Sequence, residues 1–409
     1  MTDCFLPMLG GIETQVSRLA ERQTHAGHQV TVLTCTADLK ETTPNTPYRV
    51  VRSVWKEPLK APIDPRAPRR FRELINRIQP DVVHLHMGEL TPVVQALLLS
   101  LAHTRQPVVV SVHSVWSECP TIPLYRQIAK ISHLTHEGIA WTGVSELVAS
   151  RIRQTIPSRF VRVLPNGIDS AAWKLPEIEE GGITGDSGGC ATNSGISGSA
   201  SEFAITGSFA ATGASTATGA VATEPLHVVC ATRFAPRKRI LQLLKILREA
   251  RQIAQVQRAD APLLRATIAG EGPLFSHIFK QAPTWLNLPG RLTQPELVSL
   301  YATADVFIAP GVKDAFSIAG VEARSAGLAL LTRSQSGLGQ GLRDGIEGRC
   351  AHTDTEMAQI LAEWILQPEQ VHAIKMHNRT AKSRFDWGEV LPQTEAIYRW
   401  AAELRKAKL

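Results

Sequence analysis

Short apolar runs alternate with helix-compatible stretches along most of this chain. Strands are expected over residues 29–34, 81–86, 107–112 and 140–144 and, later in the chain, over 226–231, 264–269, 304–309 and 328–331. Between them, apolar residues recur at helical spacing, as in 240–251 and 296–302. Strands that alternate with helices form parallel sheets covered on both faces. The pattern therefore predicts an α/β protein built from doubly wound parallel sheets.

One segment near the middle of the chain interrupts this alternation. Of the 43 residues from 181 to 223, 33 are Gly, Ser, Ala or Thr, and none is Lys or Arg. Such a segment cannot bury enough apolar surface to offset its ordering entropy. The 409 residues of the chain also favour two domains. We therefore predict an N-terminal domain (1–176), a flexible linker (177–225), a C-terminal domain (226–385) and a final helix (386–409) that packs back towards the first domain.

The chain opens with a glycine loop that leads into a helix. Gly10 and Gly11 precede apolar residues at helical spacing, and the helix is expected to end near Gly27. Such glycines allow close approach of a ligand to a helix N-terminus, although a Gly-Gly pair can equally form only a tight turn. A doubly wound domain normally begins with a full apolar strand, and only residues 2–5 are left for it. We therefore expect most of the first strand to be missing from this sequence.

The stretch that follows the strand at 304–309 has the composition of a phosphate site. Asp314 lies in a loop, Ser317 is a good N-cap, and Glu322 lies on the helix that Ser317 opens. Free N–H groups at a helix start favour an anion, usually phosphate. Two carboxylates beside such a site suggest a ligand that carries hydroxyls as well as phosphates. A nucleotide-sugar is the simplest such molecule.

A second strand–loop–helix corner is basic. Four of the seven residues from 233 to 239 are cations, namely Arg233, Arg237, Lys238 and Arg239, and a helix follows at once. Cations at a helix N-terminus oppose the helix dipole, so they fit this position best when an anion is bound. The alternatives are a phosphate-binding loop and a solvated basic loop.

Three histidines lie on or beside expected strands. His113 follows a buried strand, at the edge where parallel sheets bind ligands, and both ligand contact and a structural role are open for it. His84 and His86 are two residues apart on one strand. No carboxylate cluster follows them at ligand spacing, so we predict no metal site and a structural role for the pair.

Composition and charge narrow the class of protein. The chain has no run of about 18 apolar residues, no basic and apolar leader, and six scattered cysteines without a C-x-x-C pair. These features predict a cytoplasmic protein with reduced thiols. The net charge of +7 suits an anionic ligand or an anionic membrane surface. Nucleic acid is not expected as a partner, because no aromatic-rich basic stripe or known motif accompanies the charge.

Much of the positive charge lies in residues 49–77, which carry nine Lys or Arg against three acids. The basic residues are Arg49, Arg52, Lys56, Lys60, Arg66, Arg69, Arg70, Arg72 and Arg77. Charge runs are usually solvated loops and helix faces. The alternative is a surface that contacts an anionic acceptor or the inner face of the plasma membrane.

Taken together, the motifs resemble glycosyltransferase family 4, the retaining enzymes with the GT-B fold. The resemblance is carried by residues 7–15 (PMLGGIETQ), 81–86 (DVVHLH), 165–169 (PNGID), 233–238, 270–273 (GEGP), 305–310 (DVFIAP) and 314–327. It implies two Rossmann-like doubly wound domains that face an interdomain cleft. It also implies a nucleoside-diphosphate-sugar donor and a glycan or lipid acceptor. No Asp-x-Asp metal motif appears in a suitable loop and the basic residues can neutralise the diphosphate, so we expect no cofactor or metal.

The resemblance assigns roles to single residues. Glu322 would bind the donor ribose and Asp314 the donor sugar, while Arg233 and Lys238 would neutralise the leaving diphosphate. His113 would lie at the reacting sugar. The remaining donor-binding residues would be Gly10, Gly11, Glu271, Arg291, Phe316, Ser317 and Ile318.

Three positions depart from the family pattern. Asp314 stands where Glu is usual, and Arg239 and Ser317 stand where glycine is usual. These departures leave open a changed donor, a lower rate or a non-catalytic nucleotide-sugar-binding protein. An epimerase or hydrolase on the same fold is a further alternative.

Overall fold

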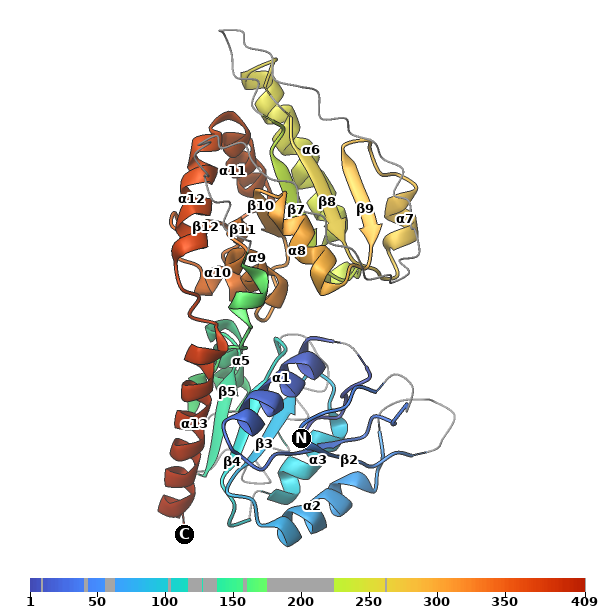
Figure 1. The fold of residues 1–409 in the computed structure, drawn as a ribbon, viewed down its shortest axis with the longest axis vertical. Coiled ribbons are helices and arrows are strands. Elements are labelled where there is room, and N and C mark those ends of the chain that lie inside the picture. The colour runs from blue at the N-terminus through green and yellow to red at the C-terminus, as the bar shows by residue number, and fades with distance from the viewer. Residues whose placement is uncertain are drawn as a thin grey trace, which may run out of the picture. The chain divides into compact units, whose positions relative to one another are not determined.

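The computed structural model describes residues 1–8, 10–39, 43–55, 63–101, 104–116, 127, 138–156, 160–174, 224–261 and 263–408. Met1–Leu175 and Pro225–Leu409 form one compact unit that contains parallel sheets and their covering helices (Figure 1). The predicted α/β fold with two parallel-sheet domains is therefore confirmed. The predicted linker lies outside the described residues, apart from its last two positions.

The C-terminal sheet has six parallel strands in the order β12-β11-β10-β7-β8-β9. They are β7 (His227–Ala231), β8 (Arg265–Ala269), β9 (Leu286–Gly290), β10 (Val306–Ala309), β11 (Ala329–Arg333) and β12 (Gly348–Ala351). Its helices are α6 (Ile240–Gln257), α7 (Phe275–Phe279), α8 (Gln294–Ala302), α9 (Ile318–Ser325), α10 (Gly337–Gly341), α11 (Asp354–Leu366) and α12 (Pro368–Thr380). The strand order reverses between β7 and β10, and ligands of such sheets bind at that point, beyond the carboxyl ends of the strands.

The N-terminal strands form two parallel groups joined by the first residues of the chain. One group is β3 (Val83–Met87), β4 (Val108–Val112), β5 (Ile139–Gly143) and β6 (Val161–Val163), and the other is β1 (Thr31–Thr34) with β2 (Arg49–Arg52). Residues 1–3 run between the groups. The Thr2 amide donates to Leu33 O at 3.1 Å, and the His86 amide donates to Met1 O at 2.9 Å. These residues thus occupy the place of a central strand.

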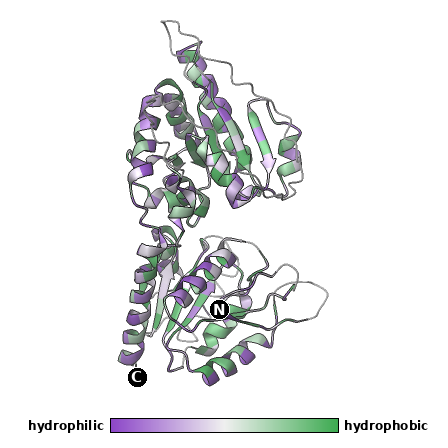
Figure 2. Ribbon diagram, viewed as in Figure 1, coloured by the Kyte–Doolittle hydropathy of each residue, from purple (hydrophilic) through white to green (hydrophobic). Residues whose placement is uncertain are grey.

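In the described part of this half, the helices are α1 (Gly11–His25), α2 (Ala67–Ile78), α3 (Pro92–Leu101) and α5 (Glu146–Thr155), followed by the short 3₁₀ turn η1 (Ser170–Trp173). The buried face of α2 is apolar and consists of Ala67, Phe71 and Ile75. Figure 2 shows both hydrophobic and hydrophilic residues along α2. No helix in the described part of the chain is long and apolar enough to cross a bilayer.

The last helix, α13 (Trp387–Lys408), packs on the N-terminal sheet. Its Ile397 and Ala401 share a buried cluster with Val109, Ala140 and Leu164. A polar contact accompanies the apolar one, because Tyr398 Oη lies 2.9 Å from His84 Nδ1 on β3. Sequence-distant segments therefore build one core around β4 and β5.

One sequence-based expectation about secondary structure is wrong. Residues 49–52 belong to strand β2 rather than to a solvated loop. Two central valines pair with β1, and the Arg52 guanidinium donates to Leu6 O and Thr36 O at 2.9 Å each. The high density of charge in residues 49–77 hid the strand-forming pair Val50 and Val51. The neighbouring Arg52 donates its hydrogen bonds to backbone carbonyls rather than to water.

Candidate active site

The reversal of strand order between β7 and β10 brings together two side chains predicted for the site. Lys238 ends the 3₁₀ turn η2 (Pro236–Lys238) after β7, and Asp314 lies in the loop after β10. Lys238 Nζ donates to Asp314 Oδ2 at 2.8 Å, and the two side chains are 25% and 18% exposed. This point of the sheet therefore holds one cation and one carboxylate in direct contact and largely shielded from water.

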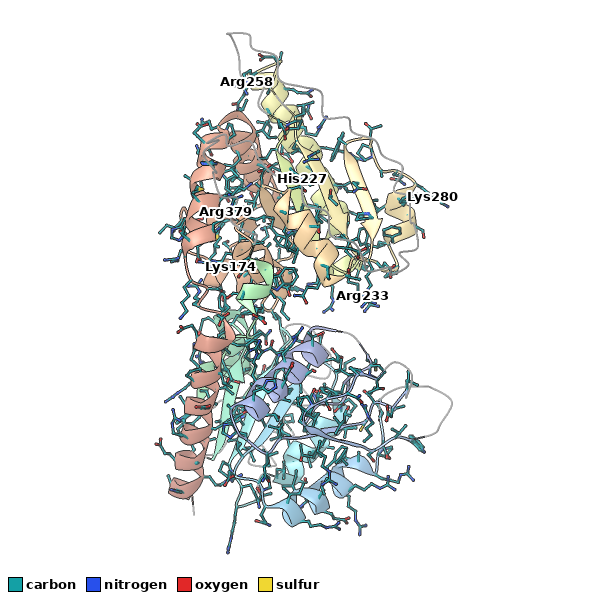
Figure 3. The ribbon with its side chains drawn as sticks, viewed as in Figure 1. Lys174, His227, Arg233, Arg258, Lys280 and Arg379 are labelled. Carbon is teal, nitrogen blue, oxygen red and sulfur yellow. The ribbon has the colours of Figure 1, made fainter. Side chains whose placement is uncertain are left out.

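The loop that carries Arg233 rests on the loop after β8. The Phe234 amide donates to Glu271 O at 2.8 Å, and Gly270 has φ +136°. A Cβ at Gly270 would lie 1.9 Å from the Thr232 carbonyl oxygen, so only glycine permits this approach. The Arg233 side chain is exposed at the carboxyl edge of the sheet (Figure 3). The loop after β8, which contains Gly270, thus supports the predicted phosphate-binding residue Arg233 through backbone contacts.

Two more predicted donor-binding side chains, Glu271 and Arg291, lie on the same edge. Glu271 is exposed after β8, and Arg291 is exposed directly after β9. Gly290 O accepts a hydrogen bond from the Gly270 amide at 2.7 Å, which joins the two strand ends. Arg233, Glu271 and Arg291 therefore follow three neighbouring strands and are more exposed than the half-buried Lys238–Asp314 pair.

The start of α9 differs from expectation. Ser317 occupies the N-cap position, but its backbone is left-handed, with φ 60° and ψ 74°, and its side chain makes no capping hydrogen bond. An N-cap side chain reaches the first-turn N–H groups from an extended backbone. The prediction of Ser317 as a good N-cap is therefore wrong. Left-handed geometry instead explains why a glycine is usual here in the family that the sequence resembles.

Phe316 and Ile318 flank this residue and have different environments. The Phe316 ring is buried and packs edge-on against Phe385, with the ring centres 5.2 Å apart. Ile318 begins α9 and is half-buried. The Phe316 side chain thus belongs to the core, which leaves the backbone of residues 316–318 as the part suited to a diphosphate.

Glu322 lies one turn into α9. Burial raises the pKa of its carboxyl to about 7, and the positive charge of Arg18 on α1 opposes part of this rise. The buried hydroxyl of Tyr301 has no hydrogen-bond partner among the described residues. Burial raises the pKa of Tyr301 well above its ordinary value, and the nearby charge of Glu322 adds to this effect. Arg18 was not predicted near this carboxyl, because no local sequence pattern connects it to α9.

Gly10 and Gly11 form the start of α1. Gly10 is the extended N-cap residue and Gly11 the first helical residue. A Cβ at Gly11 would lie 3.8 Å from Ile318 Cδ1, in ordinary van der Waals contact. The Gly10-Gly11 loop thus lies next to the start of α9. The first residues of α1 and α9, both predicted to bind the diphosphate, are therefore close together.

Two of the histidines, the buried His86 and the half-buried His113, form a hydrogen-bonded pair. His86 Nδ1 on β3 lies 3.0 Å from Nε2 of His113, which follows β4. Burial lowers the pKa of His113 to about 4, against an opposing hydrogen bond with Asn166. Burial also lowers the pKa of His86 well below its ordinary value. Both rings are therefore neutral at pH 7, and the pair shares one N–H, donated by one ring and accepted by the other.

His84 has a different role from this pair. Its Nδ1 contacts Tyr398 Oη at 2.9 Å, and its Nε2 contacts Ser111 Oγ at 2.7 Å, so it joins β3 to α13 and β4. Within the described ranges, no group of three His, Cys, Asp or Glu side chains is arranged to hold a metal ion. Asn166 and Tyr398 were not predicted as polar partners of these histidines, because both lie far from them in the sequence.

Comparison with known proteins gives consistent matches over both halves of the chain. The family model described as Glycosyltransferase Family 4 matches residues 9–172, and the one described as Glycosyl transferases group 1 matches residues 217–381. The phosphatidyl-myo-inositol mannosyltransferase of Mycolicibacterium smegmatis is 24% identical over 408 residues, which cover 95% of this chain and 90% of that protein.

Other matches are shorter or rest on structure. The D-inositol 3-phosphate glycosyltransferase of Thermobispora bispora is 27% identical over 112 residues, so this chain spans only about a quarter (26%) of that relative's length. The crystal structure of Anabaena HepE in complex with UDP aligns with a TM-score of 0.65 and 14% identity, covering 97% of this chain and 99% of that one. At this identity the structural match establishes the fold.

Proposed function

Because the protein belongs to the GT-B glycosyltransferases, we propose that it moves a sugar from a nucleoside-diphosphate sugar to a hydroxyl of a glycan or lipid, with retained anomeric configuration. The Lys238–Asp314 pair, 2.8 Å apart between β7 and β10, carries this proposal. As the bond to the sugar breaks, the diphosphate gains negative charge, and a preorganised cation stabilises that charge. Asp314 is then free to accept hydrogen bonds from sugar hydroxyls.

We assign the other donor contacts from the positions of the residues. Arg233 is exposed on the same loop as Lys238 and supplies a second positive charge to the diphosphate. The backbone at residues 316–318 and at Gly10 and Gly11 offers N–H groups to the phosphates, and Glu322 accepts the ribose hydroxyls. The bound UDP of the HepE structure supports a nucleoside diphosphate as the first ligand to test.

The proposed reaction uses front-face attack of the acceptor hydroxyl, assisted by the donor phosphate. Lys238 and Arg233 provide the charge that a metal ion would otherwise supply, so we propose a metal-independent reaction. The neutral His113 ring contacts the reacting sugar as a hydrogen-bonding group. Catalysis is then positioning together with charge stabilisation, without a covalent protein intermediate.

We further propose a cytoplasmic enzyme that takes a lipid-linked acceptor at the inner face of the plasma membrane. The name of the mannosyltransferase relative, which includes a phosphatidyl-inositol, supports a lipid acceptor.

On α2, Arg69 pairs with Glu73, and Arg66 and Arg70 pair with Asp64. Arg72 and Arg77 are exposed, and so is Trp55 beyond β2. Of the other four basic residues, Arg49 and Arg52 lie on β2, and Lys56 and Lys60 lie outside the described residues.

Sedimentation with vesicles tests this membrane contact. We expect the protein to bind vesicles that contain phosphatidylglycerol and to lose this binding as salt increases. Equal sedimentation with purely zwitterionic vesicles would remove the anionic-surface proposal and leave the transferase proposal unaffected.

A thermal-shift screen with UDP-, GDP- and ADP-sugars tests the function itself. The matching donor is expected to raise Tm, because a ligand that binds the folded state stabilises it. Product analysis with and without glycan and lipid acceptors follows, with NMR assignment of the anomeric configuration. Donor conversion that needs no acceptor would instead support an epimerase or hydrolase, and binding without turnover a non-catalytic protein.

A further inference from the structure

Arg239 adopts a backbone conformation that its residue type disfavours. It follows Lys238, has φ 58° and ψ 37°, and directly precedes α6. Among the described residues, Gln79, Arg239 and Ser317 are the non-glycine residues with positive φ. A side chain in this left-handed region costs energy that glycine avoids. Contacts of the side chain must therefore hold Arg239 in place.

These contacts join three segments at the carboxyl edge of the C-terminal sheet. Arg239 Nη2 donates to Asp354 Oδ2 at 2.7 Å, and Nη1 donates to Asp354 Oδ1 at 3.0 Å. Nη1 also donates to the Pro310 carbonyl at 3.0 Å. Asp354 begins α11 and accepts a further hydrogen bond from Arg333, at the end of β11. A forked pair of this kind fixes direction as well as distance.

The guanidinium is connected to both members of the Lys238–Asp314 pair. Lys238 is its neighbour in the chain, and Pro310 begins the loop that leads to Asp314. We propose that Arg239 is a positioning residue, which clamps the Lys238 loop and the Asp314 loop to α11. Resting on the proposed function, the clamp sets the place where Lys238 meets the donor diphosphate. A glycine at this position would suit the backbone but could not form the clamp.

The variant Arg239→Gly removes the clamp and at the same time relieves the backbone strain. Loosening of the loops in this variant therefore cannot result from added strain. Asp354→Asn weakens the forked pair from the other side, and Arg239→Lys keeps the charge without the fork. Gln79→Gly is the matched control, since it relieves a left-handed residue (φ 51°) at the end of α2, in the N-terminal half. Circular dichroism and Tm verify that each variant is folded.

Amide hydrogen exchange, measured without ligand, tests the clamp directly. Peptides that cover residues 232–240 and 310–317 are expected to exchange at least about fivefold faster in Arg239→Gly and Asp354→Asn. Arg239→Lys should give a smaller increase, and Gln79→Gly none. Wild-type exchange in both peptides of Arg239→Gly would overturn the proposal. If that variant fails to fold, wild-type exchange in Asp354→Asn and Arg239→Lys has the same meaning.

Calorimetric titration with UDP, GDP and ADP tests the consequence for the diphosphate. For whichever nucleotide the wild type binds, Arg239→Gly should weaken Kd about tenfold, a change of about 1.4 kcal/mol, and Gln79→Gly should not change it. Faster exchange with an unchanged Kd would overturn the link to Lys238. A wild type that binds none of the three nucleotides would contradict the proposed function, while the exchange data would still decide the clamp.

Discussion

The two sheets present differently built edges to the candidate site. The edge of the C-terminal sheet holds charges in pairs, Lys238 with Asp314 and Arg239 with Asp354. The edge of the N-terminal sheet holds neutral imidazoles, with His86 and His113 3.0 Å apart and the pKa of both lowered by burial. In the proposed reaction, fixed positive charge stabilises the leaving diphosphate, whereas a neutral imidazole can donate a hydrogen bond to a sugar hydroxyl or accept one from it. Under the proposed function, the contrast assigns stabilisation of the diphosphate to the C-terminal sheet and places an uncharged hydrogen-bonding group on the N-terminal sheet.

The largest expected effect on the C-terminal edge comes from a substitution that distorts its loops without changing a charge. Gly270→Ala must push the Thr232 carbonyl away from a Cβ that would lie 1.9 Å from it. We expect a loss of roughly 3 kcal/mol in the free energy of unfolding, from left-handed strain plus the displaced loop. Urea unfolding measures this loss.

Gly345→Ala is the control for that variant. Gly345 also has a positive φ, 77°, but no atom lies within 4 Å of the position that an added methyl group would take. It should lose only about 1 kcal/mol, the cost of the backbone conformation alone. Equal losses in the two variants would show that the contact with Thr232 is unimportant.

Removing the central cation is expected to have the next largest effect. Lys238→Ala should lower kcat roughly 100-fold, about 2.7 kcal/mol, because the leaving diphosphate loses its half-buried cation. Steady-state kinetics with the donor found by thermal shift measures this change. Lys245→Ala, on the exposed face of α6, is the control for a lost charge. Near-wild-type turnover in Lys238→Ala would contradict its assigned role.

On the neutral edge, the loss of one hydrogen bond should be milder. His86→Leu leaves His113 Nε2 without its partner, and we expect kcat to fall about fivefold, near 1 kcal/mol, with little change in donor KM. His86→Asn places an amide near the former Nδ1 and should recover part of the loss. If both variants match the wild type, His86 does not position His113.

The smallest effect concerns pH and Glu322, whose pKa burial raises to about 7. The folded state holds this proton more tightly than the unfolded chain, whose glutamate has its ordinary pKa near 4.5. The contribution to stability is therefore complete below that ordinary pKa and is lost as pH rises through about 7. Glu322→Gln should raise Tm by about 2 °C at pH 8 and leave it unchanged at about pH 5. A pH-independent difference would contradict this linkage.

The sequence predicted much of the fold because strand and helix periodicity is local. It also selected Lys238 and Asp314 separately. It could not predict their ion pair, because the two residues are 76 positions apart and meet only through the strand order. The left-handed backbone conformations of Arg239 and Ser317 also could not be predicted from local sequence. Residue type argues against them, and only tertiary contacts or a glycine in related sequences reveal such a backbone.

The packing of α13 has a consequence for how this chain can be recombined. Its Ile397 and Ala401 pack with strands of the first half of the chain, and Tyr398 contacts His84. The portion exchangeable with a related enzyme is therefore discontinuous in the gene. A chimaera that keeps the N-terminal sheet of this protein must also keep residues 387–408, even when everything between them comes from another parent. A simple two-part fusion would separate the His84 network from its own helix.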